Sequence, residues 1–192
     1  LVVSTVAFGY GAPGLQAASR RSEQDISDLQ ATRDSLRDSN DKTAAALAQA
    51  RQELVTLGIL AGTTPAHGSG VRITVTVPDS HLSLNYLLDG IEELRDAGAE
   101  AMEINDKVRV VAQTSFEAAT GGIDVDGRVL KSPFTIDVIG DPDSLTTALK
   151  FPGGFVDDVS LDEGKVSIKQ SQRIEVEVTR TPTEPRYAER TQ

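Results

Sequence analysis

The sequence predicts an α+β protein in which a long helical stalk precedes one compact domain. Two observations carry this prediction. Residues 25–57 follow a heptad repeat, which is typical of a coiled-coil helix, and residues 71–180 alternate between strand-like and helix-like segments. With 192 residues, the chain is long enough for one globular core and an extension, but too short for two full-sized domains and a stalk. We therefore expect a single core.

The first residues of the chain form an apolar segment. Residues 1–10, LVVSTVAFGY, carry no charge. The run Gly11-Ala12-Pro13-Gly14 that follows is rich in helix-breaking residues. Because the chain begins with Leu and not Met, we expect residues 1–14 to be the outer end of a longer apolar segment, a truncated membrane anchor or signal. A helix needs about 20 apolar residues to span a bilayer. A frayed or core-packed strand is the alternative interpretation.

Residues 22–58 predict a coiled-coil stalk helix. Ser22 is a suitable N-cap, and Gly58 closes the far end. Six of the ten inner heptad positions are aliphatic. The a positions are Ile26, Arg33, Asn40, Leu47 and Leu54, and the d positions are Leu29, Leu36, Thr43, Ala50 and Leu57.

The polar inner positions leave two interpretations of the stalk open. An Asn at an a position, here Asn40, favours a parallel dimer in fixed register. Ser39-Asn40-Asp41 is also a suitable turn, so the alternative is a helical hairpin or a single helix docked on the domain. The e and g positions carry few complementary charges and therefore do not select a partner.

After a linker over residues 59–70, the domain of residues 71–180 alternates apolar and polar residues with a β-branched bias. The predicted strands are 71–77, 100–104, 107–112, 123–125, 134–140, 166–168 and 174–178. The predicted helices are 83–97, capped by Ser83 and stopped by Gly98, and a short helix from Asp141 or Asp143 to Leu149. The first helix predicts a crossover between parallel strands.

This succession of elements is the ferredoxin-like order with an added hairpin, with helices on one face of a mostly antiparallel sheet. Residues 151–155 are predicted as a loop, and residues 181–192 as a disordered tail.

Composition and motifs indicate no catalytic chemistry. The formal charge of −10 without a basic cluster argues against nucleic-acid binding, and the absence of Cys removes disulfides and thiolate ligands. His81 with Asp79 lacks a third metal ligand, and His67 lies in the linker. The calcium-like start at Asp124 has Thr135 where the twelfth position needs an acid. The carboxylates of Glu92, Glu93 and Asp96 form a solvated helix face. We predict no enzyme activity, no cofactor and no metal.

Several segments resemble one bacterial family. They are the Leu87–Leu94 helix leading into Ala97-Gly98-Ala99-Glu100-Ala101, then Met102-Glu103-Ile104-Asn105, Gly127 to Pro133, and Ile136 to Asp141. Together they resemble domain of unknown function 881, the YlxW-like family, over about residues 70–180. The resemblance implies a single-pass protein of the cell membrane in Gram-positive or actinobacterial cells, with its domain extracytoplasmic and a part in envelope or division processes. It implies no established enzymatic activity.

Two functions follow as hypotheses. The first is a non-catalytic, membrane-tethered scaffold or interaction protein that binds a protein partner or self-associates through the stalk. The alternative is an extracytoplasmic ligand-binding sensor domain, whose candidate ligand or partner face comprises Asn105, Arg109, Gly121 and Gly122. The Asn-x-x-Arg spacing of the family is displaced here, because three residues separate Asn105 from Arg109. A purely structural role for Gly98 and Asn105 is also open.

Overall fold

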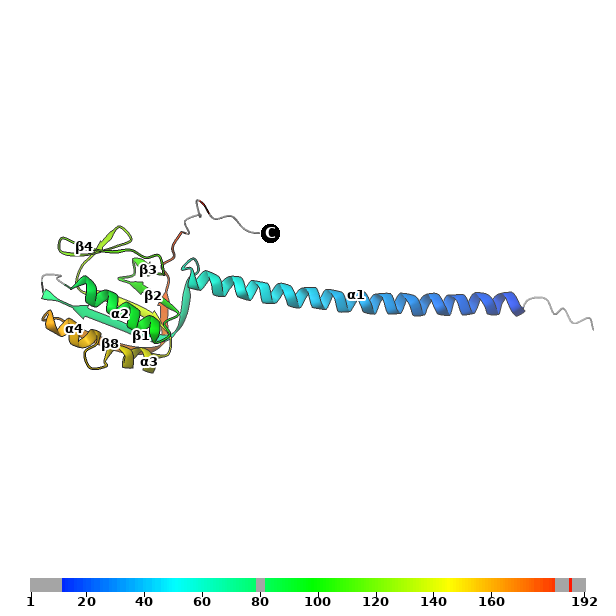
Figure 1. The fold of residues 1–192 in the computed structure, drawn as a ribbon. Coiled ribbons are helices and arrows are strands. Elements are labelled where there is room, and N and C mark those ends of the chain that lie inside the picture. Colours follow the sequence, from blue (N-terminus) through cyan, green and yellow to red (C-terminus); the bar gives the residue numbers. More distant parts are fainter. Residues whose placement is uncertain (1–11, 79–81, 182–186, 188–192) are drawn as a thin grey trace, which may run out of the picture. The chain divides into compact units, whose positions relative to one another are not determined.

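A computed structural model describes residues 12–78, 82–181 and 187 (Figure 1). The chain divides into two compact units, Leu1–Gln52 and Glu53–Gln192. The α+β class predicted from the sequence is confirmed: a long N-terminal helix precedes helices packed on an antiparallel sheet.

The long helix, α1, runs without interruption from Ala12 to Leu60. It therefore begins ten residues before the predicted cap at Ser22. Pro13 lies in the first turn, where its missing N–H removes no helical hydrogen bond. The helix-breaking run predicted at residues 11–14 therefore does not prevent helix formation from Ala12 onward. At 1.5 Å per residue its 49 residues span roughly 74 Å.

The turn predicted at residues 39–41 is helical instead, so α1 does not fold back into a hairpin. Two polar side chains near this point make contacts within the helix. Thr43 Oγ1 donates to the Ser39 carbonyl oxygen at 2.8 Å, and Lys42 pairs with Asp38 at 3.1 Å. Such local contacts remove the competition from turn conformations that the sequence suggested.

The predicted membrane segment, residues 1–14, lies outside the described residues up to position 11, and its last three residues begin α1. Within the described ranges, no helix combines the length and the apolar character needed to cross a bilayer.

The second unit is built on a five-stranded sheet with the order β3-β2-β7-β1-β8 and antiparallel neighbours throughout. Its strands are β1 Ala66–Thr76, β2 Ala101–Ile104, β3 Val108–Val110, β7 Phe134–Ile139 and β8 Lys165–Val176. Because β1 and β2 both run antiparallel to β7, they are parallel to each other. The helix between them, α2 Leu84–Asp96, makes the predicted crossover.

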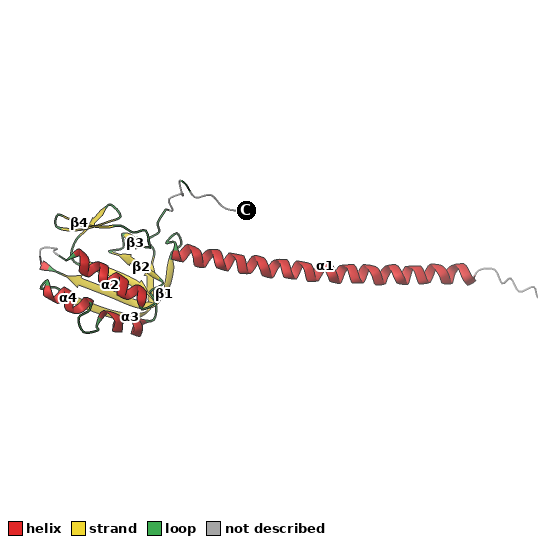
Figure 2. Ribbon diagram, viewed as in Figure 1, coloured by secondary structure: helices red, strands yellow, loops and turns green. Residues whose placement is uncertain are grey.

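Three helices cover one face of this sheet: α2, α3 Pro142–Leu149 and α4 Phe155–Leu161 (Figure 2). Alternate residues of β1, namely Val71, Ile73 and Val75, are fully buried in the main core with the apolar face of α2. A smaller apolar cluster lies apart from the main core and consists of Ala101, Ile139, Ile174 and Val176, with Ile59 and Ala66 packed against it.

The structure differs from the predicted elements at several points. β1 begins at Ala66, inside the predicted linker, and the two predicted closing strands are one continuous β8. The pairing of β1 with β8 shifts register between Gly68 and Gly70, which lets the long strands stay paired on both sides of the irregularity. The predicted loop at 151–155 runs into the unpredicted helix α4, which buries Phe155 and Val159.

A second sheet of three short strands lies between β3 and β7 in the sequence. It has the order β4-β5-β6, with β4 Phe116–Ala119, β5 Gly122–Val125 and β6 Arg128–Leu130. Only β5 was predicted, because β4 and β6 are short and mostly exposed and so lack an apolar alternation. The predicted turn at Asp126-Gly127 joins β5 to β6, with positive φ at both residues.

Gly70 provides a test of the tight β1–β7 pairing. A Cβ added at this buried position would lie 1.9 Å from the Val138 carbonyl oxygen on the neighbouring strand. We expect Gly70→Ala to lower the free energy of unfolding by about 1–3 kcal/mol, because the backbones must move apart. Chemical denaturation of the full chain measures this. Ser69→Ala, at the exposed neighbouring position, is the control, and equal losses in both variants would contradict the close approach.

Candidate functional site

Five charged side chains lie opposite one another across the whole sheet. Arg109 of β3 is in register with Glu103 of β2, Glu103 with Asp137 of β7, Asp137 with Arg72 of β1, and Arg72 with Lys169 of β8. We call these five residues the charged row. Their neighbours along each strand, such as Val71 and Ile73, face the helices, so the charged row lies on the helix-free face.

The three members of the charged row on β3, β2 and β7 are buried. Glu103, Arg109 and Asp137 are 3%, 2% and 1% exposed, and among the described residues they are the buried charged side chains. Charges removed from water to this degree need direct partners. The hydrogen-bond and ion-pair partners of these three side chains therefore show which chain segments the charged row fixes in position.

Arg72 and Asp137 form a two-pronged ion pair. Arg72 donates from Nε to Oδ1 and from Nη2 to Oδ2 of Asp137, both at 2.7 Å. This geometry is the strong form of an Arg–carboxylate contact. The hydrogen bond and the charge of Asp137 raise the pKa of Arg72, whose side chain is half-exposed. The Asp137 charge is thus compensated from the solvent side.

Glu103 holds the segment that follows β8. Its Oε2 accepts a hydrogen bond from the Val178 backbone N–H at 3.0 Å. Burial raises the pKa of Glu103, and the nearby charges of Asp106 and Asp137 raise it further, whereas the bonds from Val178 and Glu177 lower it. A buried carboxylate thereby fastens residues 177–181, which we call the C-terminal strap, to the sheet.

Arg109 joins three segments that are far apart in the sequence. Its guanidinium donates to the carbonyl oxygens of Ile59 at 2.8 Å, Thr64 at 3.4 Å and Val178 at 3.4 Å. Burial lowers its pKa, and the charge of Glu103 acts in the opposite direction. Gly62 lies against this side chain, since an added Cβ would be 2.9 Å from Arg109 Cγ. Arg109 therefore connects the end of α1, the start of β1 and the C-terminal strap.

The other predicted site residues lie at turns. Asn105, with a φ of 53°, accepts from Thr135 N–H at 2.6 Å and donates to Lys131 and Pro133 carbonyl oxygens at 3.4 Å. Gly121 lies in the β4–β5 turn with a φ of 74°, and Gly122 is the first residue of β5, where an added Cβ would lie 2.0 Å from the Leu130 carbonyl oxygen. These contacts account for the residue types at both turns. A ligand role for the four residues stays a prediction.

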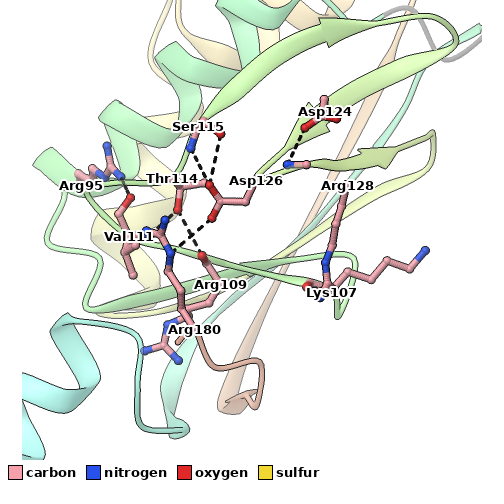
Figure 3. A network of polar contacts seen from close by, with 11 residues as sticks. Arg95, Lys107, Arg109, Val111, Thr114, Ser115, Asp124, Asp126, Arg128 and Arg180 are labelled. Carbon is pink, nitrogen blue, oxygen red and sulfur yellow. Dashed lines mark hydrogen bonds and ion pairs between the residues drawn. The ribbon is translucent and has the colours of Figure 1, made fainter. Parts of the chain in front are cut away.

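Two pockets flank the C-terminal strap, and Val178 lines both. The basic pocket has a volume of about 460 Å³ and includes Lys107, Arg109, Asp126, Arg128 and Arg180 (Figure 3). The acidic pocket has a volume of about 380 Å³ and is lined by Arg72, Glu103, Asp106, Glu175, Glu177 and Val178. Of the four predicted site residues, only Arg109 lines either one.

Sequence reasoning missed the cations of the basic pocket. Lys107, Arg128 and Arg180 come from the β2–β3 turn, from β6 and from the C-terminal strap. No spacing in the sequence links them, because the fold alone brings these segments together. Of the cations that line this pocket, only Arg109 was among the site residues predicted from the sequence.

Three carboxylates come close enough together to hold a divalent cation. Oxygens of Glu103, Asp106 and Asp137 lie within 4.8 Å of one another. Arg72 occupies both oxygens of Asp137, and the Val178 N–H occupies one oxygen of Glu103. These protein contacts account for the buried charges, so we assign no metal to the cluster.

The remaining candidates from the sequence have structural contacts. Asp124 Oδ1 accepts from Gly127 N–H at 2.8 Å, which is turn chemistry, and Glu93 Oε2 accepts from Phe155 N–H at 3.4 Å. His67 lies exposed on β1. The pair Asp79 and His81 lies outside the described residues.

The raised pKa of Glu103 predicts a specific pH dependence. The folded state binds the Glu103 proton more tightly than the unfolded chain does, so ionisation above the ordinary pKa of 4.5 favours unfolding. As the pH rises from 4.5 through the raised pKa, the free energy of unfolding of the natural chain should fall relative to that of Glu103→Gln. This relative free energy of unfolding should fall by about 1.4 kcal/mol for each unit by which folding raises the pKa of Glu103.

Denaturation curves of both proteins at a series of pH values measure this difference. Glu175→Gln, which changes an exposed carboxylate of the same pocket, is the matched control. A difference that is constant with pH, or that changes equally in the control, would contradict the assignment.

The chain is similar to curated bacterial proteins. It is 39% identical over 168 residues to the UPF0749 protein Rv1825 of Mycobacterium tuberculosis and to the UPF0749 protein Mb1856 of Mycobacterium bovis. These alignments cover 86% of this chain and 58% of each relative. The UPF0749 protein YlxW of Bacillus subtilis is 27% identical over 125 residues, which are 60% of this chain and 54% of that protein. The chain thus spans a little more than half the length of these relatives.

One solved structure is also similar. The crystal structure of an uncharacterized conserved protein from Mycobacterium tuberculosis matches with a TM-score of 0.66 and 39% identity, over 72% of this chain and 99% of that chain. The family model described as bacterial protein of unknown function, DUF881, matches residues 53–189, a range that contains the charged row and both pockets. The chain therefore belongs to the DUF881 family, as its sequence motifs suggested.

Proposed function

We propose that this protein is a non-catalytic scaffold or interaction protein of the cell envelope, and that α1 pairs with α1 of a second copy as a parallel coiled coil. The observation that carries the proposal is an exposed aliphatic stripe at heptad spacing. It consists of Ile26, Leu29, Leu36, Leu47, Leu54 and Leu57, whose exposed fractions lie between 50% and 69%. Such a seam gains stability when a second helix covers it.

The shape of the stripe supports a helical partner. A hollow on α1 is lined by Leu29, Thr32, Arg33, Leu36, Arg37 and Asn40, all at a, d, e or g positions. In a coiled coil, such a hollow receives a side chain from the facing helix. In a second copy aligned in parallel register, a Leu side chain lies at the same position along the helix axis as this hollow.

The polar inner positions are compatible with a parallel pair in register. Two Asn40 amides would meet across the seam and could hydrogen-bond to each other. Arg33 donates from Nη2 and Nε to Asp34 Oδ1 at 2.8 and 3.1 Å, which compensates its charge before two copies approach. Thr43 already donates within its own helix, so its hydroxyl is satisfied in the seam.

The flanking charges do not oppose self-pairing. In a parallel pair each g position faces the following e position of the partner. These pairs are Asp25 with Gln30, Thr32 with Arg37, Ser39 with Ala44, Ala46 with Arg51, and Glu53 with Gly58. None of them places like charges opposite each other, so the apolar stripe is not penalised by repulsion.

The proposed location is the outer face of the cytoplasmic membrane. Support comes from the uncharged apolar residues 1–10 and from the family resemblance described above. Fractionation of cells that produce the protein from its full-length gene, followed by protease treatment of intact cells without their wall, tests this location. Protection of the domain from protease would contradict it.

We also propose that the domain is an elaborated ferredoxin-like sandwich. The strand order β8-β1-β7-β2 supports this, together with the chain order of β1, α2, β2, β7, α3 and β8. In this interpretation β3 to β6 are an insertion between β2 and β7.

The proposed pairing predicts the mass of the protein in solution. We expect a dimer at micromolar concentration, and we expect Leu36→Glu combined with Leu47→Glu to weaken association by more than about 100-fold, because four buried leucines per dimer are lost. Sedimentation equilibrium measures both. Ala31→Glu combined with Ala45→Glu adds the same charges at outward f positions and should leave the dimer intact. A natural chain that stays monomeric at high micromolar concentration would overturn the proposal.

The parallel register predicts a specific crosslink. The chain contains no cysteine, so a single introduced cysteine reports one contact only. Leu36→Cys, at a d position, should form a disulfide-linked dimer under mild oxidation, because the two copies meet at the same height. Ala45→Cys, at an f position, should not. Non-reducing gel electrophoresis distinguishes them, and an antiparallel pair would leave both variants unlinked.

A further inference from the structure

The basic pocket has a charge opposite to that of the chain as a whole. Lys107, Arg109, Arg128 and Arg180 contribute four positive charges to its lining and Asp126 contributes one negative charge, which leaves a formal sum of +3. The chain carries a formal net charge of −10. A local concentration of cations on an acidic protein focuses attraction for anions at that point.

Three of the cations keep donors available to a ligand. Arg128 is exposed, and its Nη1 donates to the Lys107 carbonyl oxygen at 2.9 Å, which fixes the side chain at the rim of the pocket. Among the described residues, no protein acceptor contacts Arg128 Nη2 or Lys107 Nζ. Arg180 lies beside Asp126, with its Nε 3.7 Å from Oδ2, and in the described part of the chain its terminal nitrogens make no hydrogen bond to a protein acceptor.

The lone carboxylate of the pocket is already engaged. Asp126 Oδ1 accepts from the Ser115 N–H at 2.9 Å and from its hydroxyl at 3.3 Å, and Oδ2 lies beside Arg180 (Figure 3). Asp126 therefore orders Ser115 and Arg180 and does not cancel the charge of Lys107 or Arg128. Hydrogen bonds to Asp126 order the side of the pocket at the β5–β6 turn, whereas the charges of Lys107 and Arg128 have no carboxylate partner among the described residues there.

From this arrangement we infer that the basic pocket binds a phosphate-bearing anion with at least two negative charges. Guanidinium forks and an ammonium contributed by three segments of the lining suit the several oxygens of a phosphate, and the Ser115, Thr179 and Thr181 side chains add hydroxyl groups. The volume of about 460 Å³ lies within the range of small-molecule sites. This inference is independent of the pairing of α1.

Calorimetric titration of the full chain with inorganic pyrophosphate tests the site. We expect saturable binding with a dissociation constant below about 1 mM. Lys107→Ala combined with Arg128→Ala should weaken binding by at least about tenfold, and the unfolding midpoint should stay unchanged because both side chains are exposed.

Lys169→Ala combined with Arg173→Ala is the matched control. It removes the same charge from exposed positions outside the basic pocket, so its affinity should stay within about twofold of the natural chain. Absence of saturable binding up to about 10 mM, or an equal loss in the control, would overturn the inference.

Vesicles distinguish the two sources of such a phosphate. Flotation with vesicles of phosphatidylcholine containing phosphatidic acid, abolished by pyrophosphate and by the Lys107→Ala and Arg128→Ala pair, would assign the site to a lipid headgroup. Pyrophosphate binding without flotation would assign it to a soluble phosphate compound. Flotation that neither pyrophosphate nor the double variant reduces, without pyrophosphate binding in solution, would contradict the pocket as the binding site.

Discussion

The arrangement of the domain depends on the hydrogen bonds of the buried Arg109 guanidinium. A charge that is 2% exposed is strongly unfavourable unless hydrogen bonds replace its lost hydration. The carbonyl oxygens of Ile59, Thr64 and Val178 provide these bonds, with Glu103 beside it in the register of the sheet. The two terminal nitrogens of the guanidinium therefore reach all of their acceptors only when the end of α1, the entry to β1 and the C-terminal strap are in place, whereas the buried Nε has no hydrogen-bond partner among the described residues. One side chain thus makes three chain segments mutually dependent.

The same requirement shapes the surface around the C-terminal strap. Since Glu103 and Arg109 both hold Val178, the strap lies between two pockets of opposite character. On one side the carboxylates are compensated by Arg72, and on the other the cations outnumber their single carboxylate partner. This asymmetry is why the basic pocket, and not the closely spaced carboxylates, is the better candidate for a ligand.

The stalk differs from the domain in how its apolar side chains are buried. A lone helix cannot cover its own apolar stripe, so the exposed leucines of α1 gain only from a second helix. Polar residues at Arg33, Asn40 and Thr43 weaken the seam while they restrict its register. Stability of the domain comes from its own core, whereas association of the stalk depends on protein concentration. The two units therefore contribute separately to the scaffold role that we propose.

The sequence by itself determined the long helix, the α+β class, the crossover through α2 and the family, because these rest on local periodicity and on contiguous motifs. Alternation in residues such as Val71, Ile73 and Val75 is sufficient to identify a strand and its buried face. Only the tertiary structure decided that Glu103, Asp137 and Arg72 stand in one row and that Lys107, Arg128 and Arg180 share one pocket. Register and strand order set these neighbours, and both depend on contacts between segments far apart in the chain, which no local pattern encodes.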